Sequence, residues 1–194
     1  MTGEFPELAG PEEAMPAGLS DEFVVSVGRA GWAKGTWEMV SMLSGTNLAL
    51  AHVGGGGDED LSRLARHAQD CGVEMRVAPR LSSPELAALM RGARAVVSMA
   101  HGEPFGLTPI EAFSVGTPAI FVDEGGFRDS IVDGVNGRLI ARDDITEWHD
   151  WMEKVRDSEI REKWAEAGRE WIAELGLSPE AHCRRLVEIV DSFQ

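Results

Sequence analysis

Lysine and long apolar runs are scarce in this 194-residue chain, and each scarcity excludes a class of protein. Only three lysines occur, Lys34, Lys154 and Lys163, and the formal net charge is −15. Because no cluster of Lys and Arg is present to neutralise a phosphate backbone, a nucleic-acid partner is excluded. No apolar run approaches the length of about 18 residues that a membrane helix needs, so we expect no transmembrane segment.

Cysteine is also scarce. The two cysteines, Cys71 and Cys183, are far apart in the sequence and form no CxxC pair. The N-terminus lacks the basic start and apolar core of a signal peptide, so we expect a cytoplasmic protein with reduced, partly buried thiols. A chain of this length buries about 70% of its unfolded surface, and its fold therefore requires neither a disulfide nor a metal.

Acidic residues outnumber basic ones, 33 to 18. Few lysines and many carboxylates suit a protein that stays soluble in concentrated salt. An ordinary acidic protein has the same composition, so the sequence leaves both interpretations open.

Residues 1–20 are rich in Pro, Gly and Glu and show no periodicity, which predicts a linker or a loose extension. We expect a single domain over residues 21–194. Within it, short apolar runs rich in β-branched residues predict parallel strands that are buried on both faces. Six such runs occur, at residues 22–28, 47–53, 74–79, 93–99, 118–122 and 137–140.

Helical patterns separate these runs, at residues 37–43, 61–71 and 84–93. Ser83-Pro84-Glu85 predicts a helix start with Ser83 as the N-cap and Pro84 at the first helical position. Strands that alternate with helices predict an α/β fold, a Rossmann-like, doubly wound parallel sheet of about six strands flanked by helices.

From about residue 144 the pattern is helical to the end of the chain, and Ser178-Pro179 predicts the start of the last helix. Its predicted apolar face holds Leu186, Ile189, Val190 and Phe193. Tryptophans at helical spacing are more often core residues than ligand platforms. We therefore expect core positions for Trp148, Trp151, Trp164 and Trp171.

Three loops follow predicted strands at the carboxyl edge of the sheet, where ligands bind in open parallel sheets. The first loop, residues 28–35 (GRAGWAKG), carries Arg29 and Lys34. Two cations beside a helix start suit a diphosphate, whereas a solvated loop with incidental charges is the alternative. Because the chain has only three lysines, a lysine beside a Gly-rich turn favours a functional role.

The second loop, residues 53–60, contains four consecutive glycines, which let backbone amides approach a ligand closely. Asp58, Glu59 and Asp60 follow, and paired acids of this kind bind divalent ions. Acids in the first turn of a helix are stabilised by the helix dipole without a metal, so we predict no metal site.

The third loop, residues 100–111 (AHGEPFGLTPIE), carries Glu103 and Glu111. Thr108-Pro109-Ile110-Glu111 predicts a capping box with Thr108 as the N-cap, which gives Glu111 a structural role as the alternative to ligand binding. A capping box explains neither Glu103 nor Gly106. Two carboxylates beside an exposed amide and a helix N-terminus suit a ligand with many hydroxyls and a phosphate.

Residues 103–139, EPFGLTPIEAFSVGTPAIFVDEGGFRDSIVDGVNGRL, resemble the signature of retaining GT-B glycosyltransferases, in particular glycosyltransferase family 4. The shared pattern is a Glu, seven residues and a Glu, followed by Gly-x-Pro, Gly-Gly and Asp-Gly-x-x-Gly. Upstream, Gly28-Arg29 and Lys34-Gly35 match the family at the expected spacing. The resemblance covers roughly residues 22–190 and is closest to the mannosyl- and glucosyltransferase-like members.

The resemblance implies catalytic roles for three residues. Arg29 and Lys34 would hold the donor diphosphate and stabilise it as the leaving group, and Glu103 would contact the transferred sugar. No metal and no other cofactor is then expected, since the two cations supply the positive charge.

The resemblance also implies a set of donor-binding positions. The amides of Phe105, Gly106 and Leu107 would bind the sugar hydroxyls and the phosphate, and Glu111 would bind the ribose hydroxyls. The base would lie near Arg80 and Leu81. Gly28 and Thr108 complete the set.

The sequence departs from the family pattern in two places. Asp129 stands where many members have Glu in Gly-Gly-x-x-Glu, and four glycines replace the frequent Gly-Asp-Gly of the second loop. The resemblance moreover covers only the C-terminal, donor-binding half of a two-domain fold.

The resemblance therefore implies transfer of a hexose, of mannose or glucose type, from a GDP-, UDP- or ADP-sugar to an acceptor held by a missing N-terminal domain. Any association with a membrane surface would come through that missing half. Three explanations for the single domain stay open: a truncated enzyme, one subunit of a two-chain transferase, or a non-catalytic sugar-nucleotide-binding module. A GT-B-shaped epimerase would need different acid–base groups.

Overall fold

The computed structural model describes residues 19–20, 22–78 and 80–176, together with residues 181, 183, 184 and 188. Most of the predicted extension, residues 1–18, lies outside the described residues, as do Ser178-Pro179 and the predicted apolar face of the last helix. Leu19 is buried against the core, so packed structure begins inside the segment predicted as a loose extension.

Six parallel strands form one sheet in the order β3-β2-β1-β4-β5-β6. They are β1 (Phe23–Val27), β2 (Ala49–Val53), β3 (Met75–Ala78), β4 (Val96–Ser98), β5 (Ala119–Val122) and β6 (Gly137–Ile140). This confirms the doubly wound, Rossmann-like sheet. The strand order reverses between β1 and β4, where Val25 pairs with Val96, and ligands of such sheets bind beside that reversal point.

The strands at the centre of the sheet are buried because helices cover both of its faces. Val24 and Val25 of β1 have no exposed surface, and every residue of β2 and β5 is buried. The edge strand β3 is only half-buried. The β-branched apolar runs in the sequence therefore mark the centre of the core.

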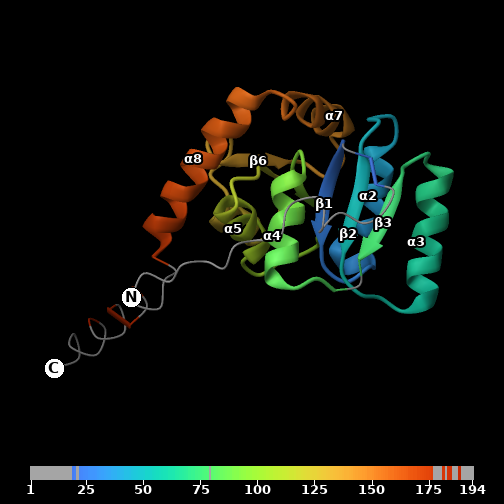
Figure 1. Cartoon of the computed structure of the whole chain (residues 1–194), viewed down its shortest axis with the longest axis horizontal. Helices are drawn as coiled ribbons and strands as arrows, with labels where there is room; N and C mark the ends of the chain where they lie inside the picture. Colours follow the sequence, from blue (N-terminus) through green and yellow to red (C-terminus); the bar gives the residue numbers. More distant parts are fainter. Residues whose placement is uncertain are drawn as a thin grey trace.

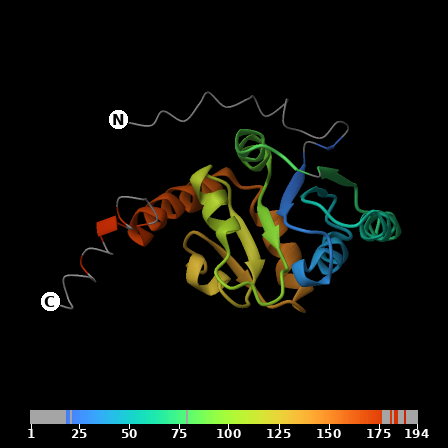
Figure 2. The same ribbon diagram turned by 90° about the horizontal axis from the view of Figure 1, so that it is seen from below.

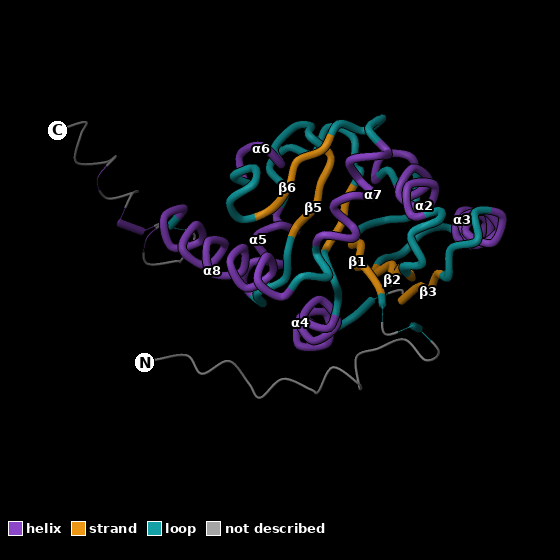
Figure 3. The backbone as a smooth tube through the Cα atoms, turned by 90° about the horizontal axis from the view of Figure 1, so that it is seen from above, coloured by secondary structure: helices purple, strands orange, loops and turns teal. Residues whose placement is uncertain are grey.

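Two layers of helices enclose the sheet. On one side α2 (Thr36–Leu43) packs against α3 (Asp58–Asp70) and α7 (Ile145–Lys154). On the other, α5 (Leu107–Ser114) packs against α4 (Ser83–Gly92), α6 (Phe127–Ser130) and α8 (Ser158–Leu175). Figure 1 labels these helices except α6, which is labelled in Figure 3, and Figure 3 shows the strands lying between the two groups of helices. In Figure 2, α3 and α8 lie at opposite ends of the molecule.

The start of α4 differs by one residue from the prediction. The N-cap is Ser82, not Ser83, and its backbone N–H donates to Glu85 Oε2 at 2.7 Å. Glu85 lies three residues after Ser82, the spacing of a capping box, and this geometry selects Ser82 over Ser83. The hydrogen bonds from Ser82 lower the pKa of the Glu85 carboxyl.

The tryptophans occupy the core positions that their spacing predicts. Trp148 and Trp164 are buried, and Trp151 and Trp171 pack partly buried against the same core. Both thiols are free, but partial burial is correct only for Cys71, since Cys183 is exposed. None of the described helices combines the length and apolar character that a bilayer crossing requires.

Candidate functional site

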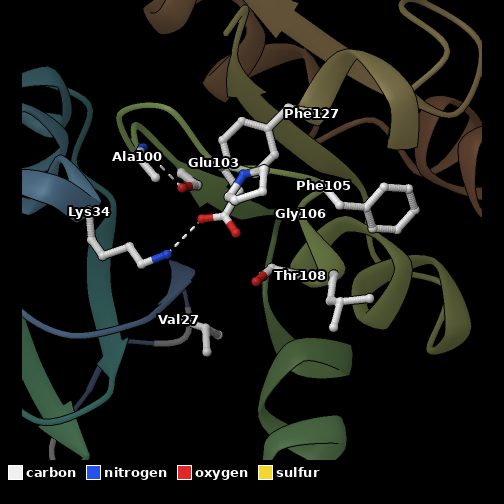
Figure 4. Close-up of a pocket in the computed structure, with 11 residues that line it drawn as sticks. Val27, Lys34, Ala100, Glu103, Phe105, Gly106, Thr108 and Phe127 are labelled. Atoms are coloured by element: carbon white, nitrogen blue, oxygen red, sulfur yellow. Dashed lines mark hydrogen bonds and ion pairs between the residues drawn. The ribbon is translucent and has the colours of Figure 1, made fainter. Parts of the chain in front are cut away.

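A pocket of about 270 Å³ opens at the carboxyl ends of β1 and β4, beside the reversal point of the strand order. Its walls come from the ends of these strands, the loop after β4, the starts of α5 and α6 and the 3-10 turn η1 (Trp32–Lys34). Figure 4 shows the lining side chains. They are Val27, Lys34, Ser98, Ala100, Glu103, Pro104, Phe105, Gly106, Leu107, Thr108 and Phe127.

An ion pair crosses this pocket. Lys34 Nζ lies 2.6 Å from Glu103 Oε2, although 69 positions separate the two residues in the sequence. The Lys34 side chain is 40% exposed and that of Glu103 is 23% exposed, so both remain open to a ligand. Figure 4 shows Lys34 reaching across from the η1 side and Glu103 from the loop after β4.

Two glycines place Lys34 opposite Glu103. Gly28 has φ 145°, and a Cβ there would lie 3.3 Å from Lys34 Cγ, so the lysine stem runs directly over the end of β1. Gly35 has φ 60°, and a Cβ there would lie 1.8 Å from Met99 O. Because Gly35 has no side chain, η1 packs against the end of β4, where His101 N donates to Ala33 O at 3.0 Å.

The start of α5 corrects the prediction of a capping box over residues 108–111. The helix begins at Leu107 with Gly106 as the N-cap, and no side chain caps it, so Thr108 is the second helical residue. Gly106 has φ 80°, and a Cβ there would lie 2.6 Å from the Phe127 ring. This left-handed residue turns the chain into the helix one step earlier than a Thr N-cap would.

Glu111 therefore takes no part in capping α5, and the structural role that the sequence offered for it is excluded. Its carboxylate is exposed on α5 and makes no hydrogen bond or ion pair with any residue in the described part of the chain. Glu111 nevertheless stands outside the residues that line the pocket.

Gly125 and Gly126 pack directly against the backbone of the Glu103 loop. Gly126 N donates to Glu103 O at 2.7 Å, and a Cβ on Gly126 would lie 2.3 Å from Phe105 Cα. Phe127 follows and packs its ring under Gly106. The Gly-Gly pair of the sequence motif thus serves packing between loops, and the exposed Asp129 lies one turn further in α6.

The remaining candidate positions do not line the pocket. Arg29 is exposed and makes no ion pair within the described part of the chain. Arg80 is exposed after β3, and Leu81 packs partly buried against the core. The sequence placed these residues by resemblance, and their contribution depends on how far a ligand extends from Lys34 and Glu103.

The four-glycine loop packs closely against the backbone of the first loop at Gly54. A Cβ at Gly54 would lie 1.8 Å from Gly28 O, and Ala30 N donates to Gly55 O at 2.8 Å. These contacts join the first two loops. Asp58, Glu59 and Asp60 occupy the first turn of α3 as predicted. Among the described residues, no three His, Cys, Asp or Glu side chains are grouped to hold a metal ion.

Sequence reasoning missed two aromatic contributions. Phe127 lines the pocket and packs edge-to-face on Phe121, with ring centroids 4.7 Å apart. Trp32 is 70% exposed and stacks on His101 at 4.3 Å, with the ring planes 9° apart. For Trp32 the available signal was an aromatic residue within the first ligand loop, and for Phe127 it was its position directly after the Gly125-Gly126 pair of the motif.

Comparisons with known proteins fit this geometry. The family model described as glycosyl transferases group 1 matches residues 13–171. The chain belongs to the group 1 glycosyl transferases. Membership of family 4 in particular stays a prediction.

The curated relatives are named glycosyltransferases, and the solved structures share the fold. The D-inositol 3-phosphate glycosyltransferase of Frankia alni is 36% identical over 115 residues, which cover 57% of this glycosyltransferase chain and 28% of the relative. Sucrose-phosphate synthase from Thermosynechococcus elongatus aligns with TM-score 0.78 and 23% identity, over 94% of this chain and 47% of that chain.

HepE from Anabaena, solved with UDP and separately with UDP-glucose, also resembles this chain. Its UDP complex aligns with TM-score 0.75 and 20% identity, over 89% of this chain and 49% of HepE. At these identities the solved structures establish the fold alone. The glycosyltransferase chain spans between 20% and 28% of the length of the curated relatives that it matches.

Proposed function

We propose that this glycosyltransferase domain binds a nucleotide diphosphate sugar and is the donor-binding half of a retaining hexosyltransferase of family 4 type. The hexose is of mannose or glucose type. In this proposal the acceptor is bound by an N-terminal domain that belongs to the same enzyme or to a partner subunit.

The Lys34–Glu103 pair is the observation that carries the proposal. A cation and a carboxylate 2.6 Å apart line one pocket at the strand reversal point. A nucleotide sugar joins an anionic diphosphate to a ring rich in hydroxyl donors. Lys34 suits the diphosphate, and Glu103 suits the sugar ring. The bond that joins the sugar to the diphosphate would therefore lie where the two side chains meet.

The start of α5 supplies a second anion contact. The first amides of a helix have no intrahelical partners and carry partial positive charge. Gly106, without a side chain, leaves these amides open beside the pocket, and Leu107 at the first helical position is 64% exposed. Phosphate oxygens are the groups that such a helix start binds best.

The chemistry asked of these residues is electrostatic. When the bond between the sugar carbon and the phosphate oxygen breaks, negative charge builds on the diphosphate and positive charge on the ring. Lys34 and Arg29 would stabilise the diphosphate as the leaving group, and fixed donors of this kind each contribute on the order of 3 kcal/mol to catalysis. We propose that no metal is required.

The relatives support the choice of ligand. HepE, a structural neighbour, has been solved with UDP and with UDP-glucose. The base itself is not specified by any side chain in the pocket. We therefore leave the donor as a UDP-, GDP- or ADP-hexose.

Calorimetric titration of the purified chain with UDP, GDP and ADP, and with their hexose conjugates, tests the proposal. We expect saturable binding of one nucleotide class and tighter binding of its hexose conjugate. If none of the six ligands binds at low or high salt, this chain does not form a donor site and the proposal is wrong.

A further inference from the structure

An arginine outside the pocket is bonded to the base of the Glu103 loop. Arg142 lies in the segment between β6 and α7, and its side chain is 22% exposed. Its Nη1 donates to Met99 O at 2.8 Å, and its Nη2 approaches Ala100 O at 3.5 Å. These two carbonyls mark the point where the chain leaves β4 and enters the loop that carries Glu103.

The same guanidinium is fixed by a carboxylate from the next strand. Arg142 Nε and Nη2 donate to the two oxygens of Glu124, at 2.9 and 2.8 Å. Glu124 follows β5 and precedes the Gly125-Gly126 pair that supports the Glu103 loop. The hydrogen bonds from Arg142 lower the pKa of the Glu124 carboxyl, which keeps it charged.

A second carboxylate extends the network to the opposite wall of the pocket. Glu38 Oε1 lies 3.9 Å from Arg142 Nη1 and is hydrogen-bonded to His101 Nε2 at 2.9 Å. Glu38 Oε2 is buried and has no hydrogen-bond partner in the described part of the chain. His101 bonds through its backbone to Ala33, next to Lys34, and stacks on Trp32.

The network therefore reaches both members of the ion pair. Arg142 contacts the chain three and four residues before Glu103, and through Glu38 and His101 it is connected to η1, which ends at Lys34. We propose that Arg142 is a positioning residue for the donor site, which fixes the Glu103 loop against η1. This inference rests on the proposed function, because the position matters only if a donor binds between Lys34 and Glu103.

A guanidinium is suited to this role, and a smaller cation is not. Its planar fork donates in several fixed directions at once, so one side chain orients two carbonyls and a carboxylate together. A residue that acts through another one need not touch the ligand. Its loss is felt as misplacement of the contacting group.

The experiment compares wild type with Arg142→Gln and with a matched control, Arg138→Gln. Arg138 lies on β6, its side chain is 26% exposed, and it also bonds two carboxylates, Asp133 and Glu147. Within the described part of the chain it makes no hydrogen bond or ion pair with a residue that lines the pocket. Binding of UDP and UDP-glucose is measured by calorimetry. Hydrogen exchange of the amides in residues 99–106 is measured in the same proteins without ligand.

We expect Arg142→Gln to bind UDP nearly as wild type does and to lose the advantage of UDP-glucose over UDP by about tenfold. Amides in residues 99–106 should exchange faster in this variant. Arg138→Gln should change neither the affinity ratio nor the exchange of this loop. That pattern assigns Arg142 to the placement of the sugar-contacting group.

Other outcomes overturn the inference. Three results would overturn the role of Arg142 and leave nucleotide binding intact. They are an unchanged affinity ratio in Arg142→Gln, an equal effect of Arg138→Gln, and a wild type for which the hexose adds no affinity. A wild type that binds neither ligand would refute the UDP form of the proposed function and this inference with it. If Arg142→Gln does not fold, Glu124→Gln takes its place, with a smaller change in the same direction; no change overturns the inference.

Discussion

At the scale of single residues, Glu111 separates ligand binding from helix capping. Because Gly106 begins α5 without a side-chain cap, Glu111→Ala removes no hydrogen bond within the described structure. Its unfolding free energy should change by no more than about 0.5 kcal/mol. If Glu111 binds the ribose, nucleotide binding should weaken by about 2 kcal/mol, about 30-fold in Kd. Calorimetry and thermal melts of the same variant measure both. Unchanged binding would remove Glu111 from the donor site.

Lys34 allows a test of phosphate recognition. The Lys34 ammonium meets Glu103 in the pocket, and the diphosphate is expected on the Lys34 side of this pair. Lys34→Ala should weaken the binding of a nucleoside diphosphate by about 2 kcal/mol and leave the binding of the nucleoside unchanged, since only the diphosphate carries the negative charge that Lys34 contacts. Lys154→Ala is the control, because Lys154 lies on α7 over the Trp151 ring. Equal losses for nucleoside and diphosphate would contradict the phosphate role.

His52 makes stability depend on pH. It is 1% exposed in β2, hydrogen-bonded through Nδ1 to Ser26 Oγ at 2.8 Å, and burial lowers its pKa from 6.5 to about 4. The unfolded chain therefore takes up the proton first. The stability is fully present above pH 6.5 and is lost as the pH falls from 6.5 through 4, by about 3 kcal/mol in all.

The measurement is urea unfolding between pH 6.5 and 4.5, with His52→Gln as the comparison. The upper part of this range avoids the titration of Glu22, Glu85 and Glu124, whose pKa values hydrogen bonds lower from 4.5. In this upper part the wild type should lose stability, and the stability of the variant should be nearly constant. A slope that persists in His52→Gln would assign the effect to another group.

At the scale of elements, one glycine determines where α5 begins. Gly106→Ala combines a positive φ with a Cβ that would lie 2.6 Å from Phe127, so we expect a loss of about 3 kcal/mol of stability. Gly102→Ala, in the same loop, also has a positive φ but meets no atom within 4 Å and should cost about 1 kcal/mol. Chemical denaturation compares the two. Equal costs would show that Phe127 does not restrict the position.

The sequence predicted all six strands from their short apolar runs, although the edge strands β3 and β6 are only partly buried. It misplaced two helix starts, at Ser83 and Thr108, for different reasons. At α4 two serines compete as N-cap, and only the reach of Glu85 decides between them. At α5 the Gly106 turn against Phe127, a residue 21 positions later, overrides a good local capping pattern.

The sequence predicted the ion-paired residues at the centre of the site, but not Arg142, which bonds to the base of the Glu103 loop. Lys34 and Glu103 were chosen from loops at the correct edge of the sheet, and the structure joins them in one ion pair. Arg142 carried no local signal. Its contacts with Met99 and Glu124 span 43 and 18 positions and exist only once β4, β5 and β6 lie side by side.

At the scale of the whole molecule, the net charge opposes the binding of an anionic ligand that the local charges of the site favour. A net charge of −15 repels an anionic nucleotide at long range. Binding must therefore come from local groups, and the pocket provides them in Lys34 and the open amides at the start of α5. Nucleotide binding thus depends on one place in the molecule and not on its overall electrostatic field.

A crystal structure of the chain soaked with UDP-glucose tests the central claim most directly. We expect the diphosphate between Lys34 and the Gly106–Leu107 amides, with the glucose ring against Glu103 and the ribose toward Glu111. UDP-glucose bound at another edge of the sheet, or bound with its phosphates away from Lys34, would contradict the account.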